Sequence, residues 1–244
     1  MIRKKRISLS IIMMIVFILF TACSNKEDAQ LTENSGSSNS KVEKTSDGEA
    51  KAIETEKAEI NFPYELDGGN LVVNALFQSS VENPDCGNEY ADDIASLEVV
   101  NQSGKYLESA QITLHTGDGT ELYMVIEDVP ANQKVWVFDN KNSSITNDVT
   151  CISINCKSDY LDEVPLMADQ ITVNTDETTV TLKNQSGETL NGLTVKCHCL
   201  FDGVYYGGLT YSYPVDELSP GGSAVIEADD CFLGTADVVR ISKN

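Results

Sequence analysis

The sequence predicts an all-β fold that contains two copies of one β unit. After residue 61, short runs of alternating apolar and polar residues are separated by Gly, Asn, Asp and Pro, which is the pattern of strands and turns. No stretch in this part keeps the apolar periodicity of a helix over three turns. A segment of the first copy also recurs in the second, where residues 182–190 repeat the pattern of residues 99–107.

The predicted strands follow one another in chain order. In the first copy they are Leu71–Phe77, Ile94–Val100, Ala110–Thr116, Glu121–Ile126, Lys134–Phe138 and Val149–Ile154. In the second copy they are Ile171–Val173, Thr178–Leu182, Leu193–Leu200, Leu209–Tyr213, Ala224–Glu227 and Asp237–Ile241. The repeated Asn-Gln-Ser-Gly sequence is expected to form a turn between strands, because Asn and Gly tolerate a positive φ.

The composition excludes one class of partner. The chain of 244 residues has 17 Lys and Arg against 38 Asp and Glu, a formal net charge of −21. Such a surface repels a phosphate backbone, so no nucleic-acid partner is expected. Hydrophobic residues make up 41% of the chain, which is sufficient for a packed core.

The amino terminus has the pattern of an export signal, predicted over residues 1–22. A basic segment, Met1–Arg6, precedes an apolar run, Ile7–Phe20, that is shorter than the roughly 20 residues of a membrane-spanning helix. The run leads into Thr21-Ala22-Cys23, which resembles the lipobox of bacterial lipoproteins. The resemblance implies that Cys23 is lipidated and anchors the protein to the cell membrane, facing the extracytoplasmic side. The alternative is an uncleaved signal anchor in which Cys23 has no role.

Residues 23–61 are predicted to hold the lipidated cysteine and a flexible acidic tether. Ser24–Ile60 has no aromatic residue and is rich in Ser, Asn, Thr and charged side chains. Such a segment cannot bury enough apolar surface to offset the loss of chain entropy. The two β units are then expected over residues 62–158 and 168–244, with a linker over residues 159–167.

Three motifs of the second copy occur together in one known family. They are Asn184-Gln185-Ser186-Gly187, the strand ending His198-Cys199-Leu200-Phe201-Asp202, and Leu218-Ser219-Pro220-Gly221. This copy resembles the FxLYD domain, a bacterial extracellular β-sandwich. The resemblance implies an immunoglobulin-like sandwich, and the repeat extends that expectation to the first copy. Because the motifs are structural, the resemblance implies no chemistry.

Six cysteines follow Cys23, and an exported location allows them to form disulfides. They are Cys86, Cys151, Cys156, Cys197, Cys199 and Cys231. On a regular strand Cys197 and Cys199 share the apolar inward face, and Cys231 follows a later strand of the same copy. We predict that Cys231 pairs with Cys197 or Cys199 and that the other is a buried thiol.

The cysteines of the first copy are less constrained. The alternation of the last strand predicts that Cys156 points inward, and that Cys151 points outward toward the loop that carries Cys86. Six cysteines allow 15 connectivities, and the sequence does not choose among them.

Cys197-His198-Cys199 also has residue types that bind soft metals. On one regular strand, however, His198 points away from the two cysteines toward solvent, so no metal site is expected. His115 has the matching outward position in the first copy. Acid pairs such as Asp92-Asp93 lack the spacing of a calcium loop. No metal and no cofactor is therefore expected.

A Tyr-rich segment is the candidate binding surface. Tyr205, Tyr206, Tyr211 and Tyr213 surround Gly207-Gly208 in a predicted hairpin. Tyr211 and Tyr213 share a face with Leu209 and are expected in the core. Tyr205 and Tyr206 point to opposite faces, so that one of them is expected to be exposed for protein or sugar recognition.

These features favour a lipid-anchored cell-surface protein without catalytic activity, which binds a protein or glycan partner or has a structural role in the envelope. No nucleophile elbow, phosphate loop or Ser–His–Asp order is present, and no catalytic residue is predicted. One alternative is a substrate-capturing lipoprotein that feeds a transporter, although such proteins usually have two α/β lobes. Another is a thiol oxidoreductase that uses Cys197 or Cys199, which predicts fast reaction of the native protein with a thiol reagent.

Overall fold

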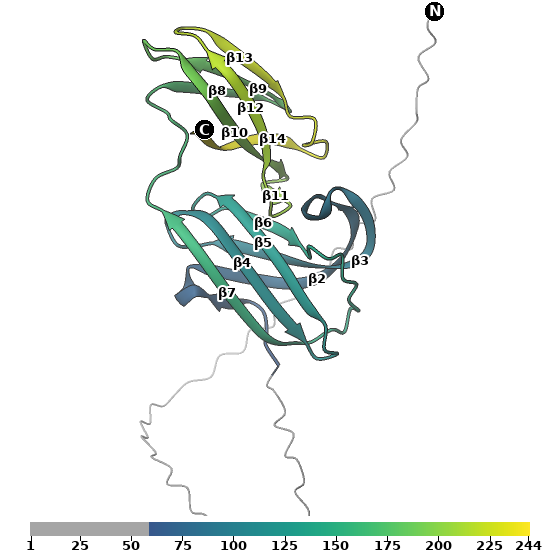
Figure 1. Ribbon diagram of the computed structural model, residues 1–244. Helices are drawn as coiled ribbons and strands as arrows, with labels where there is room; N and C mark the ends of the chain where they lie inside the picture. Colours follow the sequence, from purple (N-terminus) through teal and green to yellow (C-terminus); the bar gives the residue numbers. More distant parts are fainter. Residues whose placement is uncertain (1–58) are drawn as a thin grey trace, which may run out of the picture. The chain divides into compact units, whose positions relative to one another are not determined.

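The computed structural model describes residues 59–244, and nearly all regular structure in that range is β (Figure 1). These residues belong to one compact unit of the chain. The predicted signal peptide, Cys23 and most of the predicted tether lie outside the described residues. Among residues 59–244, no helix has the length and apolar character needed to cross a membrane. The all-β prediction is confirmed.

The described chain divides into two halves of seven strands each. The first half contains β1 (Tyr64–Leu66), η1 (Asp67–Gly69), β2 (Leu71–Asn83), η2 (Pro84–Cys86), β3 (Glu89–Asn101), β4 (Tyr106–Thr116), β5 (Glu121–Val129), β6 (Lys134–Phe138) and β7 (Cys151–Leu161). The second half contains β8 (Ile171–Asp176), β9 (Thr179–Asn184), β10 (Leu190–Phe201), β11 (Val204–Tyr206), β12 (Tyr211–Leu218), β13 (Ser223–Glu227) and β14 (Thr235–Lys243). Elements η1 and η2 are short 3-10 helices.

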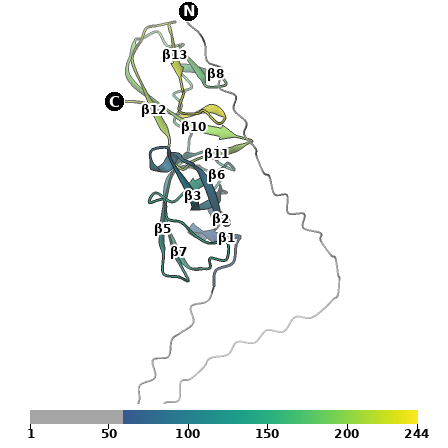
Figure 2. The ribbon, with the colours of Figure 1, turned by 90° about the vertical axis from the view of Figure 1, so that its right-hand side faces the viewer.

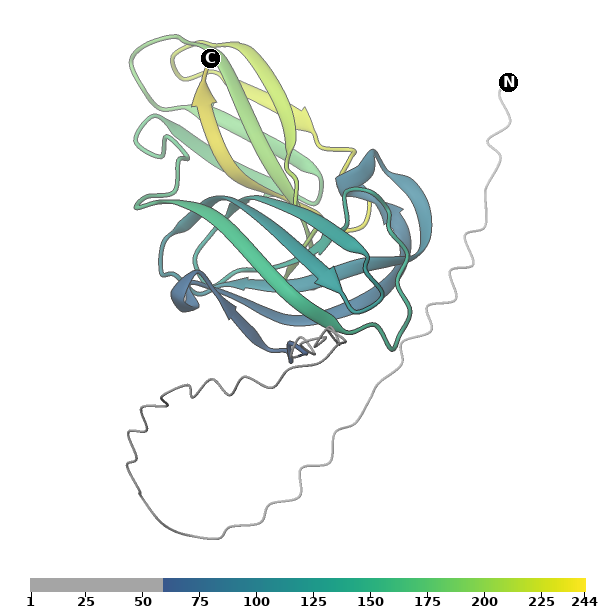
Figure 3. The same cartoon turned by 60° about the horizontal axis from the view of Figure 1, so that its bottom comes forward.

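Both halves have the same strand order. In the first half, β3 lies between β2 and β6, and β4 lies between β5 and β7 (Figure 3). In the second half, β9 lies between β8 and β13, and β10 lies between β12 and β14. Strands β2 to β7 therefore correspond in order to β8, β9, β10, β12, β13 and β14. The repeat found in the sequence is also a repeat of topology.

The repeated Asn-Gln-Ser-Gly sequence makes the same side-chain hydrogen bonds in both halves. Buried Asn184 donates from Nδ2 to the carbonyl oxygens of Glu188 and Leu218, each at 2.8 Å. Its Oδ1 accepts a hydrogen bond from Ser186 Oγ at 2.7 Å. Asn101 makes the equivalent bonds to its own half. One buried amide thus ties the turn to a second loop and supplies the donor that the buried carbonyl of Leu218 needs.

Each half has its own hydrophobic core between its two layers of strands. Leu97 and Ile112 are fully buried in the first core, and Leu182 is fully buried in the second. The first core also includes Tyr205 and Val239, which belong to the second half. The two halves therefore share buried apolar surface.

One sheet runs through both halves. Strand β6 pairs in parallel with β11, and β11 pairs in antiparallel fashion with β10 (Figure 2). The resulting eight-stranded sheet has the order β1-β2-β3-β6-β11-β10-β12, with β14 also on β10. The sequence predicts a linker over residues 159–167 as the connection between copies, whereas the structure joins them by main-chain pairing as well. Strand β7 also continues to Leu161, so residues 159–161 are strand.

The prediction of a hairpin around Gly207-Gly208 is wrong. Strands β11 and β12 do not pair with each other but pair with β10 at successive positions. The segment between them, residues 207–210, leaves the sheet and contacts the first half instead.

Candidate functional site

The segment Val204–Thr210 is where the second half enters the first. Gly207 N donates to the carbonyl oxygen of Trp136 at 2.9 Å, and Gly208 O accepts from Glu127 N at 2.8 Å. These bonds continue the β6–β11 pairing and attach the segment to β5 as well. The segment is thus part of the first half's hydrogen-bonded framework, although it lies in the second half of the chain.

Asp85 holds this segment from the first half. Its carboxylate accepts hydrogen bonds from Gly208 N at 2.7 and 2.9 Å, from Leu209 N at 2.9 Å and from Phe138 N at 3.0 Å. Burial raises the pKa of Asp85 to about 6, although the three backbone N–H groups lower it. Asn83 fixes the position of Asp85, because its Oδ1 caps η2 by accepting from Asp85 N at 2.9 Å.

A cluster of charged side chains lies beside this contact. Asp128 of β5 is 1% exposed, and its carboxylate accepts a hydrogen bond from Arg240 Nε at 2.7 Å. Lys196 Nζ lies 3.2 Å from carboxylate oxygens of both Glu127 and Asp128. Burial opposes the charge of Lys196, but the two carboxylates raise its pKa above the ordinary value. Each carboxylate of the first half is thus paired with a cation of the second half.

His198 does not point to solvent as predicted. It is fully buried, its Nε2 lies 2.6 Å from the carbonyl oxygen of Glu127, and its ring stacks on Tyr205 with centroids 4.4 Å apart. Burial lowers its pKa. The alternation along β10 holds, because Cys197 and Cys199 lie in the second core and His198 lies on the opposite face. The prediction fails because the first half covers that opposite face, which was expected to be exposed. His115, at the matching position, is half-buried.

Tyr205 and Tyr206 are not a free binding surface either. Tyr205 is 1% exposed, and its hydroxyl donates to Asp237 Oδ2 at 2.6 Å. Tyr206 is half-buried, packs edge-on against Phe138 with centroids 5.2 Å apart, and donates to the carbonyl oxygen of Glu82 at 3.3 Å. The prediction that one of the two is exposed is wrong, because the segment that carries them packs against the first half.

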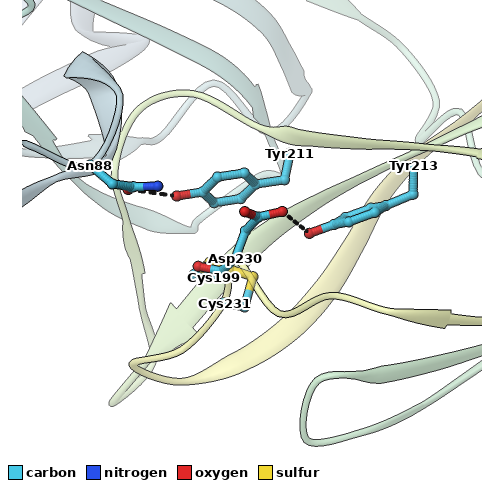
Figure 4. The surroundings of a disulfide bond; sticks show 6 residues. All are labelled: Asn88, Cys199, Tyr211, Tyr213, Asp230 and Cys231. Carbon is cyan, nitrogen blue, oxygen red and sulfur yellow. Dashed lines mark hydrogen bonds between the residues drawn. A yellow bond between two sulfur atoms is a disulfide. The ribbon is translucent and has the colours of Figure 1, made fainter.

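The predicted disulfide is present between Cys199 and Cys231, with Cα atoms 4.9 Å apart (Figure 4). Cys197 is a buried free thiol. Both parts of the prediction for the second copy are confirmed. The bond joins β10 to the loop before β14 and therefore fixes the residues next to Cys231.

Two tyrosines of β12 lie near this disulfide, as Figure 4 shows. The hydroxyl of Tyr213 donates to Asp230 Oδ2 at 2.9 Å, and that of Tyr211 donates to Asn88 Oδ1 at 3.3 Å. Both rings are half-buried against the second core, as predicted. Asn88 belongs to the β2–β3 hairpin, so this surface is built from both halves.

Phe232 and Leu233 follow Cys231 directly and are exposed to 52% and 41%. We define the composite surface as Asn88, Tyr211, Tyr213, Asp230, Phe232 and Leu233. A further exposed aromatic, Tyr90 at 64%, lies on the same hairpin as Asn88. Sequence reasoning missed the Phe-Leu pair, although two large apolar residues between an acidic pair and a glycine were a readable signal.

The cysteines of the first half are unpaired in the structure. Cys151 is buried, which corrects the prediction that it points outward, because a register shift at His115 and Thr116 reverses the alternation at the start of β7. Cys156 and Cys86 are half-buried. Burial raises the pKa of Cys156 to about 11 and that of Cys197 to about 12, so these thiols remain protonated at neutral pH.

Among residues 59–244, no group of three or more His, Cys, Asp or Glu side chains is arranged to hold a metal ion. Comparison of the chain with known families and with curated proteins gave no match to either.

Proposed function

We propose that the chain is a lipid-anchored protein of the extracytoplasmic surface that binds a partner without catalysing a reaction. In this proposal Cys23 carries the lipid, residues 24–61 are the tether, and the two halves are tandem immunoglobulin-like domains, the second of the FxLYD type. The partner is a protein or a glycan of the envelope.

The observation that carries the proposal is the composite surface. Large apolar side chains exposed next to each other are a common feature of recognition sites, and aromatic residues dominate such sites energetically. Phe232 and Leu233 stand in a loop that a disulfide fixes, so little conformational entropy is lost when they are covered.

The titratable groups of the described part support a binding role over chemistry. Asp85, Asp128 and His198 are each engaged by partners from the opposite half. The thiols of Cys156 and Cys197 have raised pKa values, which is the reverse of what an oxidoreductase needs. These contacts indicate that the buried polar residues hold the fold together.

Capture from detergent-solubilised envelopes tests the binding proposal. The full chain is compared with a double variant, Phe232→Ser with Leu233→Ser, and with Val225→Ser as control. Val225 is 62% exposed on β13, so the control also removes exposed apolar surface. We expect one partner to be captured by the wild type and by the control but not by the double variant. Equal capture by all three would refute a role for the composite surface.

The anchor is tested separately. A palmitate analogue supplied to growing cells should label the wild-type chain, and Cys23→Ala should abolish the label. A label that survives this substitution would place the lipid elsewhere.

A further inference from the structure

Asp85 accepts hydrogen bonds from both halves at once. It is 5% exposed and lies on η2 of the first half, yet two of its three donor residues, Gly208 and Leu209, belong to the second. The third, Phe138, ends β6. The two oxygens of this one side chain therefore bond N–H groups of both halves at the same time.

The donor segment fits its site only because of its glycines. A Cβ atom on Gly208 would overlap the carbonyl oxygen of Val125 and lie 2.7 Å from Val137 Cγ2. A Cβ atom on Gly207 would lie 2.6 Å from Pro84 Cγ. These obstacles all belong to the first half. Gly208 is therefore required for close approach of two main chains rather than for an unusual backbone angle.

Opening this contact would expose groups that are now fully enclosed. Tyr205 and His198 are at most 1% exposed, and both depend on the first half for that burial. Separation of the halves would also break the bonds of Gly207 to Trp136 and of Gly208 to Glu127. An isolated second half would consequently expose an aromatic surface to water and leave backbone N–H and C=O groups of the strand without partners.

We propose that Asp85 and residues Tyr206–Thr210 form a clasp that couples the two halves into one cooperative unit, so that neither half opens without the other. This inference goes beyond the proposed function and does not depend on it. It has a functional consequence, because the composite surface takes Asn88 from one half and Phe232 from the other. A closed clasp helps to keep those residues together.

Hydrogen exchange of the full chain, read by mass spectrometry, tests the coupling. Peptides from β4 report the first core and peptides from β10 report the second. In the wild type we expect the slowest amides of both strands to share one opening equilibrium, as they do in a single cooperative unit. Different protection of the two strands in the wild type would refute the clasp.

Two glycine variants separate the clasp from general destabilisation. Gly208→Ala drives a methyl group into Val125, so β10 amides should exchange at least about tenfold faster than β4 amides. Gly187→Ala is the control, since its Cβ meets nothing within 4 Å and its φ is not left-handed, and it should leave the two strands equally protected. Equal protection in Gly208→Ala, at the wild-type level, would overturn the proposal.

Two isosteric variants keep the test decisive if Gly208→Ala does not fold. Asp85→Asn should also make the β10 amides exchange faster than the β4 amides. Asp139 is a matched buried carboxylate that accepts N–H bonds from Tyr123, Lys141 and Ser143, all in the first half. With the clasp intact, Asp139→Asn should weaken protection of β4 and β10 by the same factor. An effect confined to β4 would show that the halves are independent.

Discussion

The burial of Asp85 makes a specific prediction about stability and pH. Its pKa is about 6 in the folded protein against an ordinary value of 3.8, so the folded state binds this proton more tightly than the unfolded state does. The stabilising contribution is therefore fully present below pH 3.8 and is lost as the pH rises through 6. About two pH units at 1.36 kcal/mol each give a loss of about 3 kcal/mol in the free energy of unfolding.

The neighbours of Asp85 explain why the shift is upward. Burial is the largest cause, the like charge of Glu127 adds to it, and the N–H groups of Gly208, Phe138 and Leu209 oppose it. Tyr206, whose own pKa burial raises to about 12, also faces Asp85 and stays neutral in this range. Protonation thus removes a charge from a site that has no cation of its own.

Urea unfolding between pH 4 and 7.5 measures this contribution. Trp136 is the only tryptophan and lies on β6 next to the clasp, so its fluorescence reports the transition. Asp85→Asn cannot titrate, and it keeps every other acid, so the difference between variant and wild type isolates Asp85. We expect the advantage of the wild type to be largest at pH 4 and to shrink by about 3 kcal/mol by pH 7.5. Parallel curves, or an advantage that grows with pH, would refute the reasoning.

Three further predictions concern stability and reactivity. Replacing Cys199 and Cys231 together by Ser should lower the free energy of unfolding by about 4 kcal/mol, because the disulfide spans 32 residues and restricts the unfolded chain. Urea unfolding measures this loss, and an unchanged urea midpoint would contradict the prediction. Asn184→Ala removes the donor from the buried carbonyl of Leu218 and from the part-buried carbonyl of Glu188, and it should cost about 3 kcal/mol in the same assay. A loss below about 1 kcal/mol would show that water replaces the amide. The buried thiol of Cys197 should react with a maleimide in the native protein only at the rate of unfolding. Rapid labelling of Cys197 would support the oxidoreductase alternative.

Local patterns in the sequence were sufficient for most of the strands. The predicted range Lys134–Phe138 is β6 as observed, and Leu193–Leu200 lies inside β10. Alternation of apolar residues specifies a strand that is buried on one face. Strand β11, Val204–Tyr206, was not predicted, because three residues carry no readable period and its partner β6 lies in the other half.

The same limit explains the errors at the candidate site. Alternation tells which face of a strand packs on its own core, but not whether another part of the chain covers the opposite face. His198 and Tyr205 were therefore misplaced, since both are covered by the first half. Cys151 was misplaced by a register shift, which alternation cannot detect.

The repeated asparagine was found for a partly wrong reason. The sequence predicts a turn through the tolerance of Asn for a positive φ, but neither Asn101 nor Asn184 has one. Each instead supplies a buried amide that bonds to two loops. A side-chain hydrogen bond between distant loops leaves no recognisable pattern in a single copy. The recurrence of the Asn-Gln-Ser-Gly motif in both copies nevertheless indicated that the motif has a structural role.

Site-specific photocrosslinking in intact cells tests most directly whether one surface, built from both halves, binds a partner. A benzophenone amino acid is placed at Asn88 on the first half, at Phe232 on the second, and at Val225 as an exposed control. We predict that one and the same partner is crosslinked from positions 88 and 232, and that position 225 does not capture it. Different partners at positions 88 and 232, no partner at either, or the same partner at position 225 would contradict the account.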